Sequence, residues 1–184
     1  MHVPKLSQER LDARRDGILD AARRCFAAYG YAGTTLTRLE QATGLSRGGI
    51  FNYFESKWDL FSQLAGREHA RLVEIALKDG IDTVVRAIES ADRDWLGVYV
   101  ETWQHLRTDP TRLEQATRRT QEDERFLDWV RERQDAGELR ADVDAVELAR
   151  FMSVVVDGLV LRRSLGLPVH VDPVLRLVHT GIDP

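Results

Sequence analysis

The sequence has almost no cysteine and no long apolar run, and each shortage excludes a class of protein. Its single cysteine, Cys25, excludes an internal disulfide. Cys25 lies beside Phe26 in a helical pattern, which favours a small core residue and leaves a reactive thiol as the alternative. No apolar run approaches the roughly 20 residues that a membrane span needs, and residues 1–10 lack the apolar region of a signal peptide. We therefore expect a cytoplasmic protein with no membrane partner.

Residues that carry metal or phosphate chemistry are also scarce. There is no Gly-rich phosphate loop, and no two histidines lie three or four residues apart, as a helical metal site would require. Glu101 and His105 are four residues apart and could meet on one helix face, which leaves a small helical enzyme as an alternative. Such a lone pair is far more often structural. We expect no catalytic residue, no metal and no cofactor.

The composition is that of a folded globular protein whose charge is unevenly distributed. The 184 residues are 43% hydrophobic and 30% charged, enough for one or two domains with a real core. The net charge is −4, yet residues 1–57 hold nine Lys or Arg against six Asp or Glu, and the rest holds seventeen against twenty-four. A basic N-terminal part joined to an acidic remainder favours a phosphate-binding surface in the N-terminal part.

The stretch from Thr34 to Trp58 predicts two short helices joined by a tight turn. Thr35 is a suitable N-cap for the first helix, and Gly44 suits the left-handed backbone at its end. Ser46 would cap a second helix whose inward residues are Ile50 and Phe54, four apart on one face. This is the layout of a helix-turn-helix, in which the second helix lies in the major groove of DNA.

The outward face of the second helix is polar or small. Gly48 and Gly49 are poor helix residues, each costing up to ~1 kcal/mol relative to alanine, so the helix backbone is expected to approach another surface closely. Lys57 begins the next helix, where its charge and the N-terminal amides could meet one phosphate. The alternative is that the glycines mark a loop and Lys57 is an ordinary surface lysine.

The segment from about Ile18 to Phe61 resembles the DNA-binding domain of the TetR family of bacterial transcriptional repressors. The resemblance is carried by Ile18-Leu19-Asp20-Ala21-Ala22, Phe26-Ala27-Ala28-Tyr29-Gly30-Tyr31, Gly33-Thr34-Thr35-Leu36, Gly44-Leu45-Ser46-Arg47-Gly48, Ile50-Phe51-Asn52-Tyr53-Phe54 and Lys57-Trp58-Asp59-Leu60-Phe61. It implies an all-α fold: a three-helix helix-turn-helix domain over residues 1–57 and a helical ligand-binding and dimerisation domain over residues 58–184.

Surface reasoning and the resemblance agree on the residues that contact DNA. The predicted DNA-binding set is Thr35, Thr37, Arg47, Gly48, Gly49, Phe51, Asn52, Tyr53 and Lys57. The members expected to hold phosphates are Thr35, Tyr53 and Lys57, and those expected at base edges are Thr37, Arg47, Gly48 and Asn52. Phe51 departs from the family's usual tyrosine and lacks the hydroxyl that would reach a phosphate, so we expect only apolar contact there.

The remainder reads as a series of helices with one unusually apolar member. Helices are predicted over residues 58–78, 81–90, 94–106, 111–136, 144–165 and 172–180. Residues 144–165 are apolar on more than one face and need cover on more than one side. Gly158 would let a second helix approach closely. We therefore expect a homodimer that uses residues 144–165 and 172–180.

The ligand-binding residues are expected mainly on the helix over residues 94–106. Candidates are Trp95, Tyr99, Glu101, Trp103 and His105, with Arg118 or Gln121 opposite. The alternative is that Trp95, Tyr99 and Trp103, four apart, form the core stripe of that helix.

Three further segments are similar to aconitase repressors of actinobacteria: Arg23-Arg-Cys-Phe26, Leu106-Arg-Thr-Asp-Pro110 and Val155-Val-Asp-Gly-Leu159. Their effector is a citrate–magnesium pair. No cluster of basic residues in this chain matches that site, so the effector is left unidentified.

Taken together, these patterns predict a repressor that binds a palindromic double-stranded DNA operator as a homodimer. A small-molecule effector would release it by favouring a state that no longer matches the operator. A regulator controlled by a protein partner is the alternative.

Overall fold

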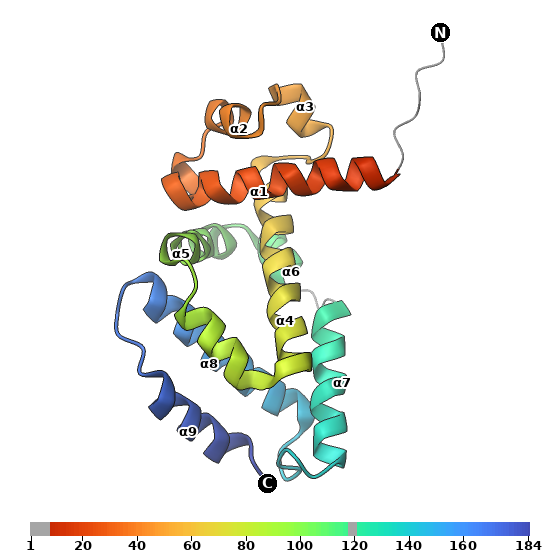
Figure 1. The fold of residues 1–184 in the computed structure, drawn as a ribbon, viewed down its shortest axis with the longest axis vertical. Helices are drawn as coiled ribbons and strands as arrows, with labels where there is room; N and C mark the ends of the chain where they lie inside the picture. The colour runs from red at the N-terminus through yellow and green to blue at the C-terminus, as the bar shows by residue number, and fades with distance from the viewer. Residues whose placement is uncertain (1–7, 118–120) are drawn as a thin grey trace. The chain divides into compact units, whose positions relative to one another are not determined.

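The computed structural model describes residues 8–117 and 121–184, and every regular element in these ranges is an α-helix (Figure 1). The predicted all-α fold is confirmed. The helices are α1 (Gln8–Gly33), α2 (Leu36–Thr43), α3 (Arg47–Phe51), α4 (Lys57–Glu89), α5 (Arg93–Thr108), α6 (Pro110–Thr117), α7 (Gln121–Asp135), α8 (Ala145–Ser164) and α9 (Val171–Ile182). None of the described helices combines the length and the apolar character needed to cross a bilayer.

The chain forms two compact units, Met1–Arg67 and Glu68–Pro184, here called the N-terminal and the C-terminal unit. The division falls inside α4, which contributes to both. Gly80 interrupts α4 with a non-helical backbone (φ 81°, ψ 173°), where the sequence predicted one helix to end and another to begin. Gly30 interrupts α1 in the same way (φ 69°, ψ 174°).

The N-terminal unit packs α2 against α1 around an aromatic core, and Figure 1 shows α2 and α3 on the same side of α1. Phe26 is fully buried and stacks on Tyr31 with ring centroids 5.8 Å apart. Phe61 of α4 meets both rings edge-on, at 5.8 and 5.6 Å. Thr34 is also fully buried, and its hydroxyl donates to the Gly30 carbonyl at 2.7 Å. This core fixes the connection from α1 into α2.

The C-terminal unit is built around α8, which packs against both α5 and α7. Leu148, Met152 and Leu159 face inward from α8, with exposures of 5% or less. Phe151 and Val154 of the same helix are 40% and 63% exposed. One chain therefore covers only part of this apolar helix, as its sequence indicated.

Several helix boundaries differ from the sequence expectation, most of them by one or two residues. The second helix of the helix-turn-helix ends at Phe51, so the buried Phe54 follows the helix instead of lying on it. Two helices, α6 and α7, are described where one helix was expected over residues 111–136, and residues 118–120 between them lie outside the described range. The last helix begins at Val171, one residue before the expected start.

Candidate DNA-binding surface and C-terminal pocket

The turn between α2 and α3 is held by local hydrogen bonds. Gly44 ends α2 in the left-handed region (φ 68°), and its N–H donates to the Glu40 carbonyl at 2.9 Å. The Ser46 hydroxyl accepts from the Gly49 N–H at 3.3 Å and so caps α3. The Arg47 N–H donates to the Glu40 carboxylate at 2.6 Å, which ties the first turn of α3 to α2. The caps predicted at Thr35 and Ser46 are confirmed.

Helix α3 has one buried side and one open side. Ile50 is 1% exposed and anchors the helix on the core, whereas Arg47 and Gly48 are exposed. No atom lies within 4 Å of the position that a Cβ on Gly48 would occupy. Phe51 is half-buried, and the Arg47 guanidinium lies 5.8 Å from its ring centroid. The open side of α3 therefore carries the positive charge of Arg47, and the helix backbone at Gly48 is accessible.

Asn52 and Tyr53 follow α3 instead of lying within it. Asn52 is the exposed C-cap, and its N–H donates to the Gly48 carbonyl at 3.0 Å. Tyr53 is half-buried in the turn after the cap. Thr37 is exposed in the first turn of α2.

A concave surface in the N-terminal unit brings four of the nine predicted DNA-binding residues together. These four are Thr35, Arg47, Phe51 and Lys57, and the other lining residues are Ala32, Thr34, Leu36, Glu55 and Ser56. Sequence reasoning did not assign Glu55 or Ser56 to the site. The Ser56-x-x-Asp59 capping pattern was the available signal, because it places Ser56 at the N-terminus of α4. The Ser56 hydroxyl accepts from the Asp59 N–H at 3.0 Å, as that pattern predicts.

Lys57 is held in place by the fold. Its ammonium donates to the carbonyls of Tyr31 at 2.9 Å and Thr34 at 3.2 Å, and it lies 4.4 Å from the Tyr31 ring centroid. Lys57 therefore stabilises the connection from α1 to α2 and also adds positive charge to the concave surface.

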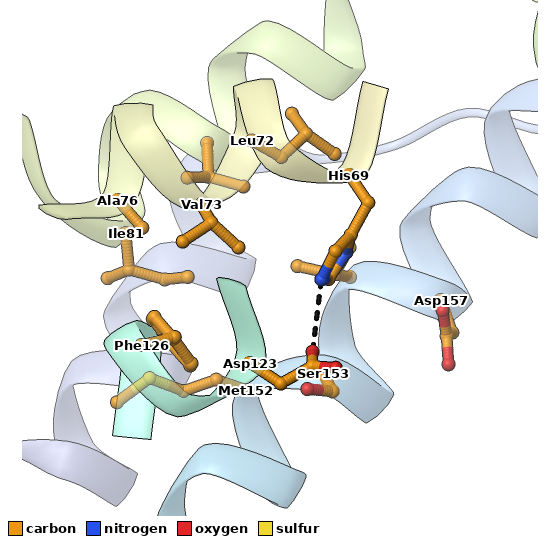
Figure 2. A pocket seen from close by; sticks show the side chains of 12 residues that line it. His69, Leu72, Val73, Ala76, Ile81, Asp123, Phe126, Met152, Ser153 and Asp157 are labelled. Carbon is orange, nitrogen blue, oxygen red and sulfur yellow. Dashed lines mark hydrogen bonds and ion pairs between the residues drawn. The ribbon is translucent and has the colours of Figure 1, made fainter. Parts of the chain in front are cut away.

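The C-terminal unit contains a pocket of about 150 Å³ between α4, α7 and α8 (Figure 2). Eight apolar residues line it: Leu72, Val73, Ala76, Ile81, Val84, Phe126, Met152 and Val156. The four polar lining residues are His69, Asp123, Ser153 and Asp157. None of the six predicted ligand-binding residues that the structure describes lines this pocket.

The predicted ligand-binding residues lie elsewhere. Trp95 is a buried core residue, 2% exposed, and its ring meets Tyr99 edge-on with centroids 5.5 Å apart. Trp103 is 40% exposed. Glu101 and His105 are half-buried, Gln121 is exposed, and Arg118 lies outside the described residues. The four-residue spacing of the aromatic residues correctly predicted that Trp95 lies on the inner face of α5. It could not predict where a cavity would lie.

Two polar groups of the pocket form a histidine–carboxylate pair, and a further carboxylate, that of Asp157, is exposed. His69 Nε2 lies 3.0 Å from Asp123 Oδ1. Burial raises the pKa of the Asp157 carboxyl, and the charge of His69 acts in the opposite direction. Within residues 8–117 and 121–184, no group of three or more His, Cys, Asp or Glu side chains is arranged to hold a metal ion.

Comparison with known proteins gives matches over both units. Residues 18–64 match the family described as bacterial regulatory proteins, tetR family, and residues 76–183 match the family described as BetI-type transcriptional repressor, C-terminal. The HTH-type transcriptional repressor Rv1474c of Mycobacterium tuberculosis is 39% identical over 184 residues, covering 98% of each chain. The HTH-type transcriptional repressor AcnR of Corynebacterium glutamicum is 40% identical, covering 83% of this chain and 82% of its own. The expected similarity to the actinobacterial aconitase repressors is thereby confirmed.

Solved structures share the fold. Salmonella enterica GusR superposes with a TM-score of 0.74 at 23% identity, covering 92% of this chain and 94% of its own. A cysteine mutant of the TetR family regulator CifR, complexed with 26-bp double-strand operator DNA, superposes with a TM-score of 0.57 at 22% identity, covering 90% and 94%. The family and the relatives are transcriptional regulators, not enzymes. The chain therefore belongs to the TetR family of bacterial regulatory proteins, and it is a helix-turn-helix transcriptional repressor.

Proposed function

We propose that this repressor binds a palindromic operator as a homodimer and leaves it when a small-molecule effector binds. Residues 1–57 would form the DNA-binding domain and residues 58–184 the regulatory and dimerisation domain. Because its target is chromosomal DNA, the protein would act in the cytoplasm. The proposal rests above all on the concave surface that gathers Thr35, Arg47 and Lys57 beside the open side of α3.

The DNA contacts follow from the chemistry of that surface. Arg47 would pair with a guanine, and Asn52 would read an adenine or a phosphate. Thr35, Tyr53 and Lys57 would hold phosphates, and Thr37 would reach a neighbouring base edge. The open position beside Gly48 would let the helix backbone approach DNA, with Gly49 behind it and Phe51 making apolar contact.

A homodimer is supported by apolar side chains left open on α8 and α9. Phe151 and Val154 on α8 and Leu177 on α9 are 40%, 63% and 72% exposed. Exposed large apolar groups gathered on two neighbouring helices favour a protein interface. A dimer whose recognition helices are about 34–36 Å apart would read two half-sites one helical turn apart.

The effector site is proposed at the pocket lined by His69, Met152 and Asp157. It has the features of a small-molecule site, namely a mostly apolar wall and a few polar groups at one side (Figure 2). It also contacts α4, the helix shared by both units. The α5 residues predicted from sequence stay a prediction.

An operator-binding experiment tests the proposal directly. The protein would be titrated against the DNA that flanks its own gene, with a scrambled duplex as competitor, in a mobility-shift assay. Arg47→Ala should weaken specific binding by about 1–3 kcal/mol, the contribution of one bidentate base contact. The matched control is Arg131→Ala, which removes another exposed arginine, on α7, and should leave the affinity unchanged.

The variant Lys57→Met tests the contact with the DNA backbone separately from the contacts with the bases. It should weaken binding to specific and scrambled duplexes alike and reduce the dependence of affinity on salt. Because Lys57 also bonds two carbonyls, thermal unfolding of the variant must be measured alongside. Full specific affinity in Arg47→Ala would refute the assignment of α3 as the recognition helix.

A further inference from the structure

Helix α3 is too short to fix its own direction. It spans only Arg47–Phe51, and the first four N–H groups of any helix have no partner within that helix. Its position must therefore come from contacts with neighbouring residues. Ile50, 1% exposed, anchors its inner side, and the Ser46 hydroxyl accepts from the Gly49 N–H at its start.

A further bond to the start of α3 comes from a different helix. Glu40 lies in the last turn of α2, and its carboxylate accepts from the Arg47 N–H at 2.6 Å. The Glu40 carbonyl accepts from the Gly44 N–H at 2.9 Å, so this one residue bonds both the end of α2 and the start of α3. A hydrogen bond from an N–H to a carboxylate is roughly twice as strong as a neutral one.

The bond acts on the residue whose side chain is proposed to read a base. Arg47 is exposed and lines the concave surface, together with Phe51. Glu40 is half-buried and is not among the residues that line this surface. Its carboxylate therefore fixes the main chain of Arg47 without using the guanidinium.

The charge of Glu40 does not itself favour DNA. Phosphates repel a carboxylate, and binding of DNA depends strongly on the positive charges that neutralise them. A contribution of Glu40 to operator binding must therefore come from geometry and not from electrostatic attraction.

We infer that Glu40 is a positioning residue for base reading, because its carboxylate sets the direction in which α3 presents Arg47 to the major groove. Without the bond, the start of α3 would turn about its Ile50 anchor, and the guanidinium would lose its bidentate alignment with a guanine. Phosphate contacts from Thr35 and Lys57, which lie outside α3, would be retained. The inference rests on the proposed function, because it names a residue that determines the specificity of that same surface.

Two substitutions of Glu40 separate the hydrogen bond from the charge. Glu40→Ala removes both, whereas Glu40→Gln removes the charge and keeps an oxygen that can accept from the Arg47 N–H. Mobility-shift titrations of the full chain against the DNA that flanks its own gene and against a scrambled duplex give a ratio of two affinities. Glu40→Ala should lower this ratio about tenfold, within the discrimination that one bidentate base contact provides, and Glu40→Gln should leave it unchanged.

The control variant is Asp16→Ala, which removes an exposed carboxylate from α1 and should leave the ratio unchanged. A fall in Glu40→Gln or in Asp16→Ala that equals the fall in Glu40→Ala would assign the effect to charge and refute the inference. An unchanged ratio in Glu40→Ala would refute it as well. Equal losses of affinity for both duplexes in Glu40→Ala would show that the residue only supports the fold, which also contradicts the inference.

A double substitution tests whether Glu40 acts through Arg47. In an Arg47→Ala background the guanidinium that the bond orients is absent, so adding Glu40→Ala should lower the ratio no further. Additive losses would mean that Glu40 acts on other DNA contacts, and the positioning of Arg47 would be refuted.

The failure of this inference can be told apart from that of the proposed function. If the natural protein does not distinguish the flanking DNA from the scrambled duplex, the proposed function fails and the inference fails with it. If the natural protein distinguishes them and Glu40→Ala does so equally well, only the inference fails.

Discussion

At the scale of single residues, the two glycines of the helix-turn-helix have opposite reasons for being glycine. Gly44 adopts φ +68°, a backbone that side-chain-bearing residues rarely adopt. Gly48 lies inside α3 with open space where a Cβ would be. The fold therefore requires glycine at 44, whereas at 48 the requirement would come from a partner that approaches the helix.

Substituting alanine at each position should give opposite changes in the free energy of unfolding. Gly44→Ala should destabilise the protein by about 1 kcal/mol, because of the left-handed backbone. Gly48→Ala should stabilise it by about 0.5–1 kcal/mol, since alanine is the better helix residue. Urea denaturation of both variants measures these changes.

The same Gly48→Ala variant should bind operator more weakly, by about tenfold, because its methyl group would occupy the space that DNA needs. A variant that is both more stable and equal in operator affinity would show that DNA does not approach α3 at this position. Gly17→Ala on α1 is the control: it also has open space, and it should leave operator affinity unchanged.

At the scale of elements, His179 joins α9 to the second part of α4. Its ring nitrogens lie 2.8 Å from Asp82 Oδ1 and 3.2 Å from Asp183 Oδ1. Hydrogen bonds to Asp183 and Asp82 raise the pKa of His179. The folded state therefore prefers the charged imidazole more strongly than the unfolded state does.

This preference predicts the direction in which stability changes with pH. A raised pKa in the folded state gives stabilisation that is complete below the unfolded value of about 6.5 and is lost as pH rises through the folded value. His179→Gln should therefore lose stability relative to the natural protein near pH 5.5, by at most about 1 kcal/mol because the pair is exposed. The difference should shrink above pH 8.

Urea midpoints measured from pH 5.5 to 8.5 check this prediction. His170→Gln, at the start of α9, is the matched control, because His170 makes no side-chain capping bond. A constant difference between His179→Gln and the natural protein over the whole range would mean that packing, not ionisation, accounts for the effect.

Element boundaries also explain what the sequence could predict. The caps at Thr35 and Ser46 and the breaks at Gly44 and Gly80 depend on bonds within a few residues, so local sequence was enough to predict them. The end of α3 at Phe51 was missed, because a buried Phe54 at helical spacing looks the same whether or not the helix continues.

The C-terminal pocket could not be predicted for a different reason. Its walls come from three helices that are far apart in the sequence, with His69, Phe126 and Met152 as examples. Periodicity indicates which side of a helix faces inward, but it does not indicate where the packing of three inward sides leaves a gap. The aromatic residues of α5 were predicted to bind a ligand because they are large, but Trp95 is buried in the core and does not line a pocket wall.

At the scale of the whole molecule, one apolar face remains to be covered. Phe151 and Val154 on α8 and Leu177 on α9 stay exposed in a single chain, although the inner side of each helix is already in the core. Gly158 is exposed and has no atom within 4 Å of the position of an added Cβ, so the single chain leaves this position on α8 open. This combination favours a second copy of the chain as the missing cover.

Two substitutions should convert the predicted dimer into a folded monomer. Gly158→Trp would prevent close approach of the partner's helix, and Leu177→Asp would bury a charge in the interface. Light scattering coupled to gel filtration should give the mass of one chain, 21.0 kDa, with unchanged helical circular dichroism. Operator affinity should fall about a hundredfold or more, because each half-site would be bound independently.

Leu113→Asp, which charges an exposed leucine on α6, should remain dimeric. If both variants keep the mass of two chains, the interface lies elsewhere and the open face of α8 and α9 needs another explanation.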